Sequence, residues 1–141
     1  MPSQSPDADA REAAETGRPL VLIVDDNEKN LKLAMDVLRA AGFRTLEAAN
    51  GLEGIALAGE HLPNVILMDL RLPDMDGTDA AQRLGDEART ASIPVVALSS
   101  LRLEGGGDWL QAAGFAGCLE KPISVGEFPD QVRHYCTSTA A

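Results

Sequence analysis

Short, wholly apolar runs alternate along this chain with longer segments in which apolar residues recur every three or four positions. The stretch 65–73 begins with the β-branched Val65 and is closed by Pro73, which is typical of a strand buried on both faces of a parallel sheet, and the apolar runs at 20–24 and 95–98 are of the same type. Two further runs are less uniformly apolar and predict weaker strands. The predicted strands are Leu20–Val24, 43–48, 65–68, 95–98 and 115–119.

The first intervening segment predicts an amphipathic helix. Asn27 or Asp26 is a suitable cap, apolar residues follow at helical spacing, and Gly42 is placed to end the helix. The apolar positions are Leu31, Ala34, Met35, Leu38 and Ala41.

Asn50 and Gly51 predict a turn before a second helix over 52–61, which we expect to direct four apolar side chains inward: Leu52, Ile55, Ala56 and Leu57.

Three more helices are predicted towards the C-terminus. An acidic turn, 74–77, leads into a helix over 78–84. Three glycines at 105–107 disfavour a helix, so the next one is expected to begin at Asp108 and to close at Gly114. The last helix reaches about Tyr135. Ser124 and Glu127 have the spacing of a capping box, with Ile123 and Phe128 as its staple, but Pro129 conflicts with that register and predicts an irregular start.

Strands that alternate with helices through short connections predict a three-layer α/β sandwich with a five-stranded parallel sheet and right-handed crossovers. We expect one domain over 19–136, a disordered tail over 1–18 and a short tail over 137–141. No DNA-binding or other output domain is expected in the chain.

The composition narrows the function classes. A formal net charge of −10 argues against a nucleic-acid surface and against an anionic membrane, so neither is expected as a partner. Cys118 and Cys136 have no metal-binding spacing and are expected to be free thiols in a reducing compartment, with the cytoplasm as the predicted location. No apolar run approaches the roughly 18 residues of a membrane-spanning helix.

Polar residues follow several of the predicted strands. Asp25 and Asp26, Asp69, Ser99 and Lys121 each come at the carboxyl end of a strand, where open α/β sheets bind their ligands. Three carboxylates at one edge repel one another unless a hard cation lies among them. Carboxylates with a backbone carbonyl suit Mg²⁺, and Lys121 and Ser99 add an ammonium and a hydroxyl for a phosphoryl oxygen. Each residue alone has an ordinary explanation, such as helix capping for the Asp25–Asp26 pair, but together they favour a site.

Four motifs carry a resemblance to a known family: 24–27 (VDDN), 68–77 (MDLRLPDMDG), 95–100 (VVALSS) and 121–123 (KPI). With these motifs in this order, the chain resembles the receiver domains of bacterial two-component response regulators, most closely their single-domain, DivK-like members. The resemblance covers about 20–135 and implies a flavodoxin-like topology with strand order 2-1-3-4-5.

The resemblance also implies roles for individual residues. Asp69 matches the phosphoacceptor, and a histidine kinase or a histidine phosphotransfer protein would be the phosphoryl donor. Asp26 matches the direct Mg²⁺ ligand, Asp25 the acid that holds the metal through water, and the Arg71 carbonyl the third protein ligand, with Asp69 itself also in the metal site. Lys121 matches the lysine that pairs with the phosphoryl group, and Ser99 the hydroxyl that moves towards it. Pro122 resembles a cis proline of the family, although the isomer stays open.

Two departures concern the conformational switch. Cys118 stands where most relatives have a rotating aromatic ring, and the glycines at 105–107 stand where relatives begin a helix. We therefore predict a switch based on ordering of 101–109. Trp109, the only Trp, is expected to lie partly outward as a docking anchor for an unidentified effector protein or, alternatively, as an accident of the loop.

The favoured function is a stand-alone phosphoacceptor that signals through protein–protein interaction. One alternative is an intermediate phosphate shuttle of a multistep phosphorelay without an effector of its own. A second is a flavodoxin-like electron carrier, which the acidic segment 25–28 disfavours because it would repel a flavin phosphate. A third is an aspartyl phosphatase, which would need an acid where Arg71 stands.

Overall fold

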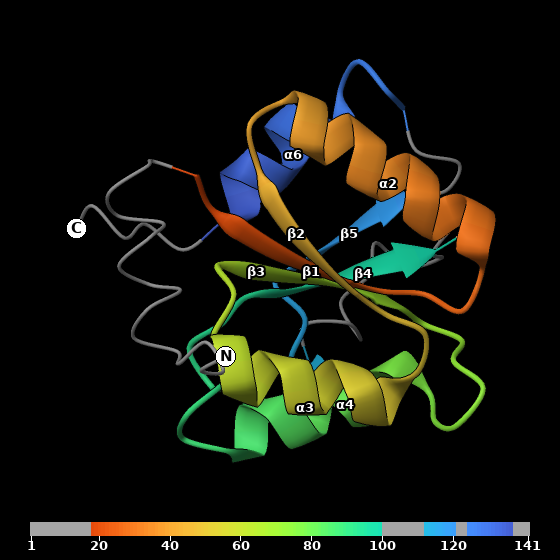
Figure 1. The fold of residues 1–141 in the computed structure, drawn as a ribbon. Helices are drawn as coiled ribbons and strands as arrows, with labels where there is room; N and C mark the ends of the chain where they lie inside the picture. Colours follow the sequence, from red (N-terminus) through yellow and green to blue (C-terminus); the bar gives the residue numbers. More distant parts are fainter. Residues whose placement is uncertain (1–17, 100–111, 121–123, 137–141) are drawn as a thin grey trace, which may run out of the picture.

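The strands of this protein form one parallel sheet. A computed structural model describes residues 18–99, 112–120 and 124–136. Five strands pair in the order β2-β1-β3-β4-β5, and every pairing is parallel. The sheet lies between two layers of helices (Figure 1). The predicted fold class, sheet direction and strand order are therefore confirmed.

The three central strands are β1 (Leu20–Val24), β3 (Val65–Asp69) and β4 (Val95–Ser99), and their side chains are buried on both faces of the sheet, apart from the half-buried Asp69. The edge strands β2 (Arg44–Ala48) and β5 (Gly117–Glu120) are only partly buried. This difference matches the sequence pattern, since the wholly apolar runs became the central strands and the mixed runs became the edges.

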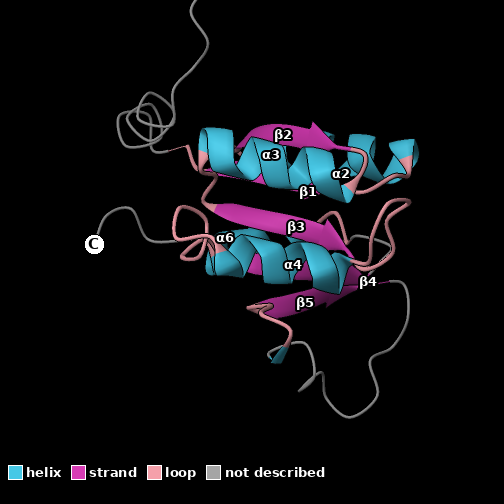
Figure 2. Ribbon diagram, turned by 90° about the horizontal axis from the view of Figure 1, so that it is seen from below, coloured by secondary structure: helices cyan, strands magenta, loops and turns pink. Residues whose placement is uncertain are grey.

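The helices cover the two faces of the sheet in pairs. Helices α2 (Glu28–Ala40) and α6 (Phe128–Tyr135) pack on one face, and α3 (Gly51–His61) and α4 (Gly77–Asp86) pack on the other (Figures 1 and 2). Successive strand residues therefore serve two cores. Val21 and Ile23 belong to the core under α2 and α6, whereas Leu22 and Val24 belong to the core under α3 and α4.

The ends of α2 follow the prediction. Asn27 is the N-cap, and its side chain accepts a hydrogen bond from the Asn30 N–H at 3.1 Å. After the C-cap Ala41, Gly42 has φ +95°, a left-handed conformation that favours glycine. The buried residues on the inward face of α2 are Leu31, Ala34 and Leu38.

The predicted inward face of α3 was wrong for two of its four residues, Leu52 and Ala56. Leu52 is 59% exposed, and Ala56 is also exposed. The buried residues are instead Gly51, Gly54 and Ala58, while Ile55 and Leu57 pack at the margin of the core. Small residues on this face let the backbone of α3 approach β1 closely. The prediction was based on the large apolar side chains of the helix, and these contribute little to the packed surface.

The start of α6 also differs from the predicted capping box. Glu127 is itself the N-cap, without a side-chain cap bond, and Pro129 lies in the first turn. The Ser124 carbonyl accepts hydrogen bonds from the Glu127 and Phe128 N–H groups, at 3.1 and 2.8 Å, and forms a turn before the helix. Proline lacks the N–H that the predicted register required at the helix start. The irregular start that Pro129 predicted is confirmed.

Several predictions lie outside the described residues: the helix beginning at Asp108, the glycine run 105–107, Trp109, Lys121, the Lys121–Pro122 bond, Ile123 of the staple, and most of both predicted tails. In the part of the chain that the structure describes, no helix combines the length and apolar character needed to cross a membrane.

Candidate functional site

Three carboxylates meet at the carboxyl ends of β1 and β3. Asp25 and Asp26 follow β1 directly, and Asp69 is the last residue of β3, the strand beside β1. One oxygen from each carboxylate can be chosen so that all three atoms lie within 4.8 Å of one another. Parallel pairing causes this convergence, because it brings the carboxyl ends of neighbouring strands to the same edge.

The three acids differ in exposure. Asp25 is buried and its Oδ1 accepts a hydrogen bond from the Asn27 N–H at 2.9 Å, which fixes the turn that leads into α2. Asp26 is exposed, and Asp69 is half-buried. The cluster therefore opens to solvent on one side and is backed by the core on the other.

The backbone after β3 folds around Asp69. The Arg71 N–H donates to Asp69 Oδ1 at 3.1 Å, and the Leu70 N–H donates to the Leu98 carbonyl at 3.3 Å. Arg71 then pairs with Asp76 in an isolated antiparallel bridge. These contacts keep the backbone of Arg71 next to the cluster.

Ser99 ends β4, the next strand along the sheet, and is buried. Asp69 pairs with Leu98 in the register, so Ser99 lies one residue further towards the same edge. The structure thus brings four of the predicted polar residues to one edge, namely Asp25, Asp26, Asp69 and Ser99, while Lys121 lies outside the described residues.

Cys118 lies within β5, half-buried against the core under α3 and α4. Its thiol lies 3.7 Å from the Leu119 carbonyl oxygen. Burial, with a smaller contribution from the nearby Glu120 charge, raises the pKa of the Cys118 thiol. The raised pKa favours the neutral thiol, and Cys118 lies in the fifth strand, as predicted.

The donor set of the cluster suits a hard divalent cation. Carboxylate oxygens and a backbone carbonyl are ligands that Mg²⁺ prefers, and the open side leaves room for the waters that Mg²⁺ retains. The charges also require an explanation, since close carboxylates destabilise one another without a cation. In the described ranges, no other group of three or more His, Cys, Asp or Glu side chains has metal-binding geometry.

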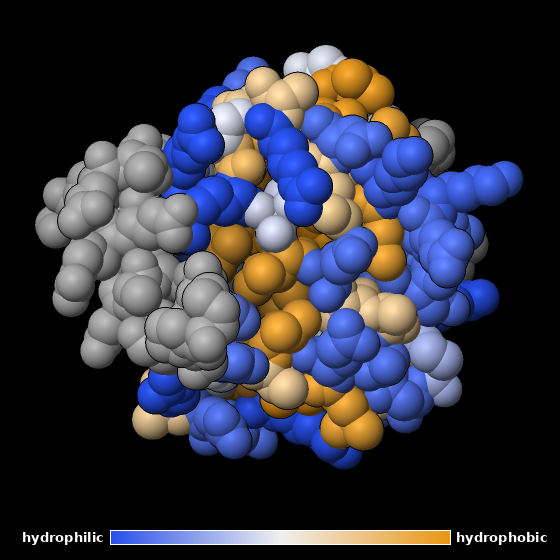
Figure 3. Space-filling model, in the orientation of Figure 1, coloured by the Kyte–Doolittle hydropathy of each residue, from blue (hydrophilic) through white to orange (hydrophobic). Residues whose placement is uncertain are grey.

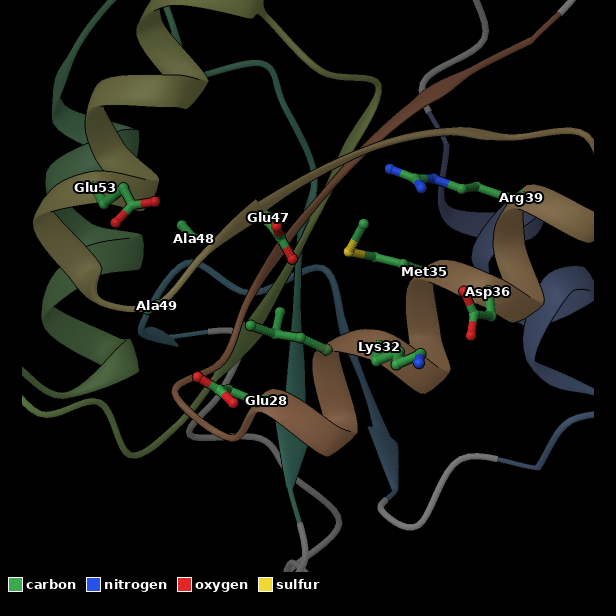
Figure 4. A pocket seen from close by; sticks show the side chains of 10 residues that line it. Glu28, Lys32, Met35, Asp36, Arg39, Glu47, Ala48, Ala49 and Glu53 are labelled. Carbon is green, nitrogen blue, oxygen red and sulfur yellow. The ribbon is translucent and has the colours of Figure 1, made fainter.

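A separate hollow of about 550 Å³ lies between α2 and the open edge of β2. Its lining combines apolar and charged side chains, which Figure 4 labels, and Figure 3 shows apolar patches among hydrophilic residues on one face of the molecule. The lining residues are Glu28, Leu31, Lys32, Met35, Asp36, Arg39, Glu47, Ala48, Ala49 and Glu53. None of the three clustered acids lines the hollow, so the hollow and the carboxylate cluster are different places.

Sequence reasoning did not single out Asp74, which lies in the loop between β3 and α4. Its Oδ1 accepts a hydrogen bond from the Gly51 N–H at 2.8 Å, and its Oδ2 accepts one from the Leu52 N–H at 2.9 Å. These two bonds hold the pKa of the Asp74 carboxyl below its ordinary value. No local motif predicts a cap supplied from 22 and 23 residues away.

Comparisons with known proteins agree with this geometry. The family described as "Response regulator receiver domain" matches residues 21–133. The polar-differentiation response regulator DivK of Brucella anthropi is 38% identical over 115 residues, which cover 82% of this chain and 94% of that protein. DivK of Brucella melitensis is 37% identical over the same shares of both chains.

Solved structures show the same fold. The receiver domain of the sensor histidine kinase PA1611 from Pseudomonas aeruginosa, described with a magnesium ion coordinated in its active site cleft, is 28% identical. It aligns with a TM-score of 0.76 over 84% of this chain and 97% of that one. The chemotaxis response regulator CheY4 of Vibrio cholerae, 24% identical over 84% of this chain and 98% of its own, aligns with a TM-score of 0.79 and supports the fold alone.

Proposed function

Since the chain belongs to the response regulator receiver domain family, we propose that it accepts a phosphoryl group on Asp69 and passes the signal to a protein partner. The observation that carries the proposal is the meeting of Asp25, Asp26 and Asp69, with oxygens within 4.8 Å of one another, at the carboxyl edge of a parallel sheet. Receiver domains act together with histidine kinases or phosphotransfer proteins, and a phosphohistidine of such a protein is the proposed donor.

In the proposed reaction, a carboxylate oxygen of Asp69 attacks the phosphorus atom of the phosphohistidine. A new O–P bond forms while the P–N bond breaks, and its electron pair stays on the histidine nitrogen. The product is an acyl phosphate on Asp69. This chemistry needs in-line positioning and neutralisation of charge rather than a strong base.

Asp26, Asp25 and the Arg71 carbonyl would hold Mg²⁺, the first directly and the second through water. A bound Mg²⁺ supplies positive charge to the phosphoryl oxygens. The buried backing of Asp25 and the Arg71 N–H bond to Asp69 support this assignment, because they orient the carboxylates towards one point. The magnesium in the cleft of the PA1611 receiver is consistent with it.

Lys121 is proposed to pair with the phosphoryl group, and Ser99 to donate its hydroxyl to a phosphoryl oxygen and so report its presence. The burial of Ser99 at the end of β4 supports its part, because a buried hydroxyl is held in place for such a contact. Cys118 in β5 would respond by packing rather than by ring rotation, and the ordering of 101–109 around Trp109 is proposed as the output to an effector.

Intact mass measurement tests the proposal. Incubation with acetyl phosphate or phosphoramidate and Mg²⁺ is expected to add one phosphoryl group to the wild type and none to Asp69→Ala. Asp86→Asn, a change of an exposed acid at the end of α4, is the control and is expected to label like the wild type. Labelling that persists in Asp69→Ala would overturn the proposal.

A further inference from the structure

The segment 70–77 comprises the loop between β3 and α4 and the first residue of α4. It is attached to the N-terminus of α3. Asp74 accepts hydrogen bonds from Gly51 and Leu52, the first two residues of that helix, at 2.8 and 2.9 Å. The N-cap Asn50 accepts from the third, Glu53, at 2.8 Å. The first three N–H groups of α3 thus have side-chain acceptors, and two of them depend on a residue from another element.

A second contact reinforces the attachment. A Cβ atom at Gly51 would lie 2.6 Å from Met75 Cγ and 2.7 Å from Met75 Sδ, so the Met75 side chain occupies the space beside the first residue of the helix. Met75 also packs against the core under α3 and α4. Asp74 and Met75 therefore hold the loop by a polar and an apolar contact on adjacent residues.

The same loop carries the proposed site. Its ends are closed by the Gly77 N–H, which donates to the Leu70 carbonyl at 2.9 Å, and by the bridge between Arg71 and Asp76. A Cβ at Gly77 would overlap the Asp69 carbonyl oxygen, so the return of the loop is packed against the phosphoacceptor itself. In such a closed loop, a displacement at Asp74 is transmitted to the backbone of Arg71.

We propose that Asp74 is a positioning residue for the acidic centre, which by fastening 70–77 to α3 fixes the Arg71 carbonyl and the Asp69 carboxylate where Mg²⁺ and the phosphoryl group are bound. Asp74 does not belong to the three-carboxylate cluster, so it acts through the loop and not as a ligand. Its negative charge also suits the positive end of the α3 dipole. The inference rests on the proposed function of Asp69.

Asn50 provides a matched control, because it caps the same helix but has no contact with 70–77 in the hydrogen bonds described. Asp74→Ala is expected to weaken Mg²⁺ binding, measured by calorimetry with MgCl₂, by roughly tenfold, as for other residues that orient metal ligands. It is also expected to speed amide hydrogen exchange across 70–77 in metal-free protein. Asn50→Ala is expected to lower stability while leaving Mg²⁺ affinity within twofold of the wild type.

Asp74→Asn keeps one acceptor oxygen and is expected to fall between the wild type and Asp74→Ala. The inference is overturned if Asp74→Ala binds Mg²⁺ like the wild type, or if Asn50→Ala weakens binding equally, since capping alone would then explain the effect. The proposed function fails differently. A wild type that takes no phosphoryl group would refute it, whereas Mg²⁺ affinity and amide exchange would still decide the role of Asp74.

Discussion

Three charges of the same sign lie close together at the carboxyl ends of β1 and β3. Asp25, Asp26 and Asp69 place carboxylate oxygens within 4.8 Å of one another, and Asp25 is buried. Charges at such a distance repel by about 1 to 4 kcal/mol at the effective dielectric of a protein surface. The fold keeps the carboxylates close despite this cost, because the parallel strands end at the same edge and the Asn27 N–H bond holds Asp25 in the turn.

Neutralising the buried acid is therefore expected to stabilise the metal-free protein. Asp25→Asn keeps the oxygen that accepts from the Asn27 N–H and removes one of the three charges. In EDTA, we expect the unfolding free energy to rise by about 1 kcal/mol, which shifts Tm by roughly 3 to 6 °C. With saturating Mg²⁺ the order should reverse, because the variant lacks a ligand. Differential scanning calorimetry checks both arms, and a lower Tm for Asp25→Asn in EDTA would contradict the repulsion.

Asp74 should contribute to stability in a pH-dependent way. Its folded pKa lies below the ordinary value of 3.8 because the Gly51 and Leu52 N–H groups bond to the carboxylate. The contribution is thus fully present above that value and is lost as the pH falls through the lower, folded pKa. Urea titrations from about pH 7 down to about pH 3 should show the difference between wild type and Asp74→Asn shrinking in the acid range. The difference between wild type and Asn50→Ala, whose cap is uncharged, should stay constant.

Single residues of the site were predictable only where they directly follow or end a strand that the sequence pattern reveals. Asp25, Asp26, Asp69 and Ser99 could be predicted because a strand end is visible as an apolar run that stops. Asp74 could not, since its partners lie on another helix and are found only once the loop and α3 are packed together.

Helix α3 shows what decides a packing face at the scale of an element. Its buried positions are small, and a Cβ at Gly54 would lie 2.7 Å from Val24 Cγ2 of β1. Hydrophobic periodicity predicted that Leu52 faces inward, although it is 59% exposed. Such a pattern identifies large apolar side chains but does not show where small residues let the helix backbone approach the sheet. The other element that differed, α6, did so because Pro129 sits in its first turn. Strands and helix boundaries governed by caps and left-handed glycines were predictable, since their causes are local.

Two glycines of α3 should respond oppositely to the same substitution. Gly54→Ala forces α3 away from Val24 and is expected to cost about 1 to 3 kcal/mol, as overpacking does. Gly59→Ala adds a methyl group with nothing within 4 Å and is expected to gain about 0.5 to 1 kcal/mol through helix propensity. Urea unfolding at neutral pH measures both, and a Gly54→Ala variant as stable as the wild type would show that the approach of α3 to β1 is not tight.

At the scale of the whole molecule, two features matter: the parallel sheet topology and the excess of negative charge. The alternation of strands and helices was enough to predict a parallel sheet, whereas its strand order was predicted from the resemblance to receiver domains. The formal net charge of −10 is a property of the entire chain and acts on every folded state. Self-repulsion of this size weakens the compact state and is screened by salt.

Monovalent salt and Mg²⁺ should consequently stabilise the protein through separable effects. Raising NaCl from about 10 mM to about 150 mM in EDTA shortens the Debye length from about 30 Å to about 8 Å and should raise Tm in wild type and Asp26→Ala alike. Mg²⁺ at about 100 times its Kd, added at constant ionic strength, should add roughly 2.7 kcal/mol to the wild type, because it binds only the folded state. Asp26→Ala, which lacks the proposed direct ligand, should lose this second increment and keep the first. An equal Mg²⁺ increment in both proteins would mean that the ion acts by general screening of the negative surface and not at the carboxylate cluster.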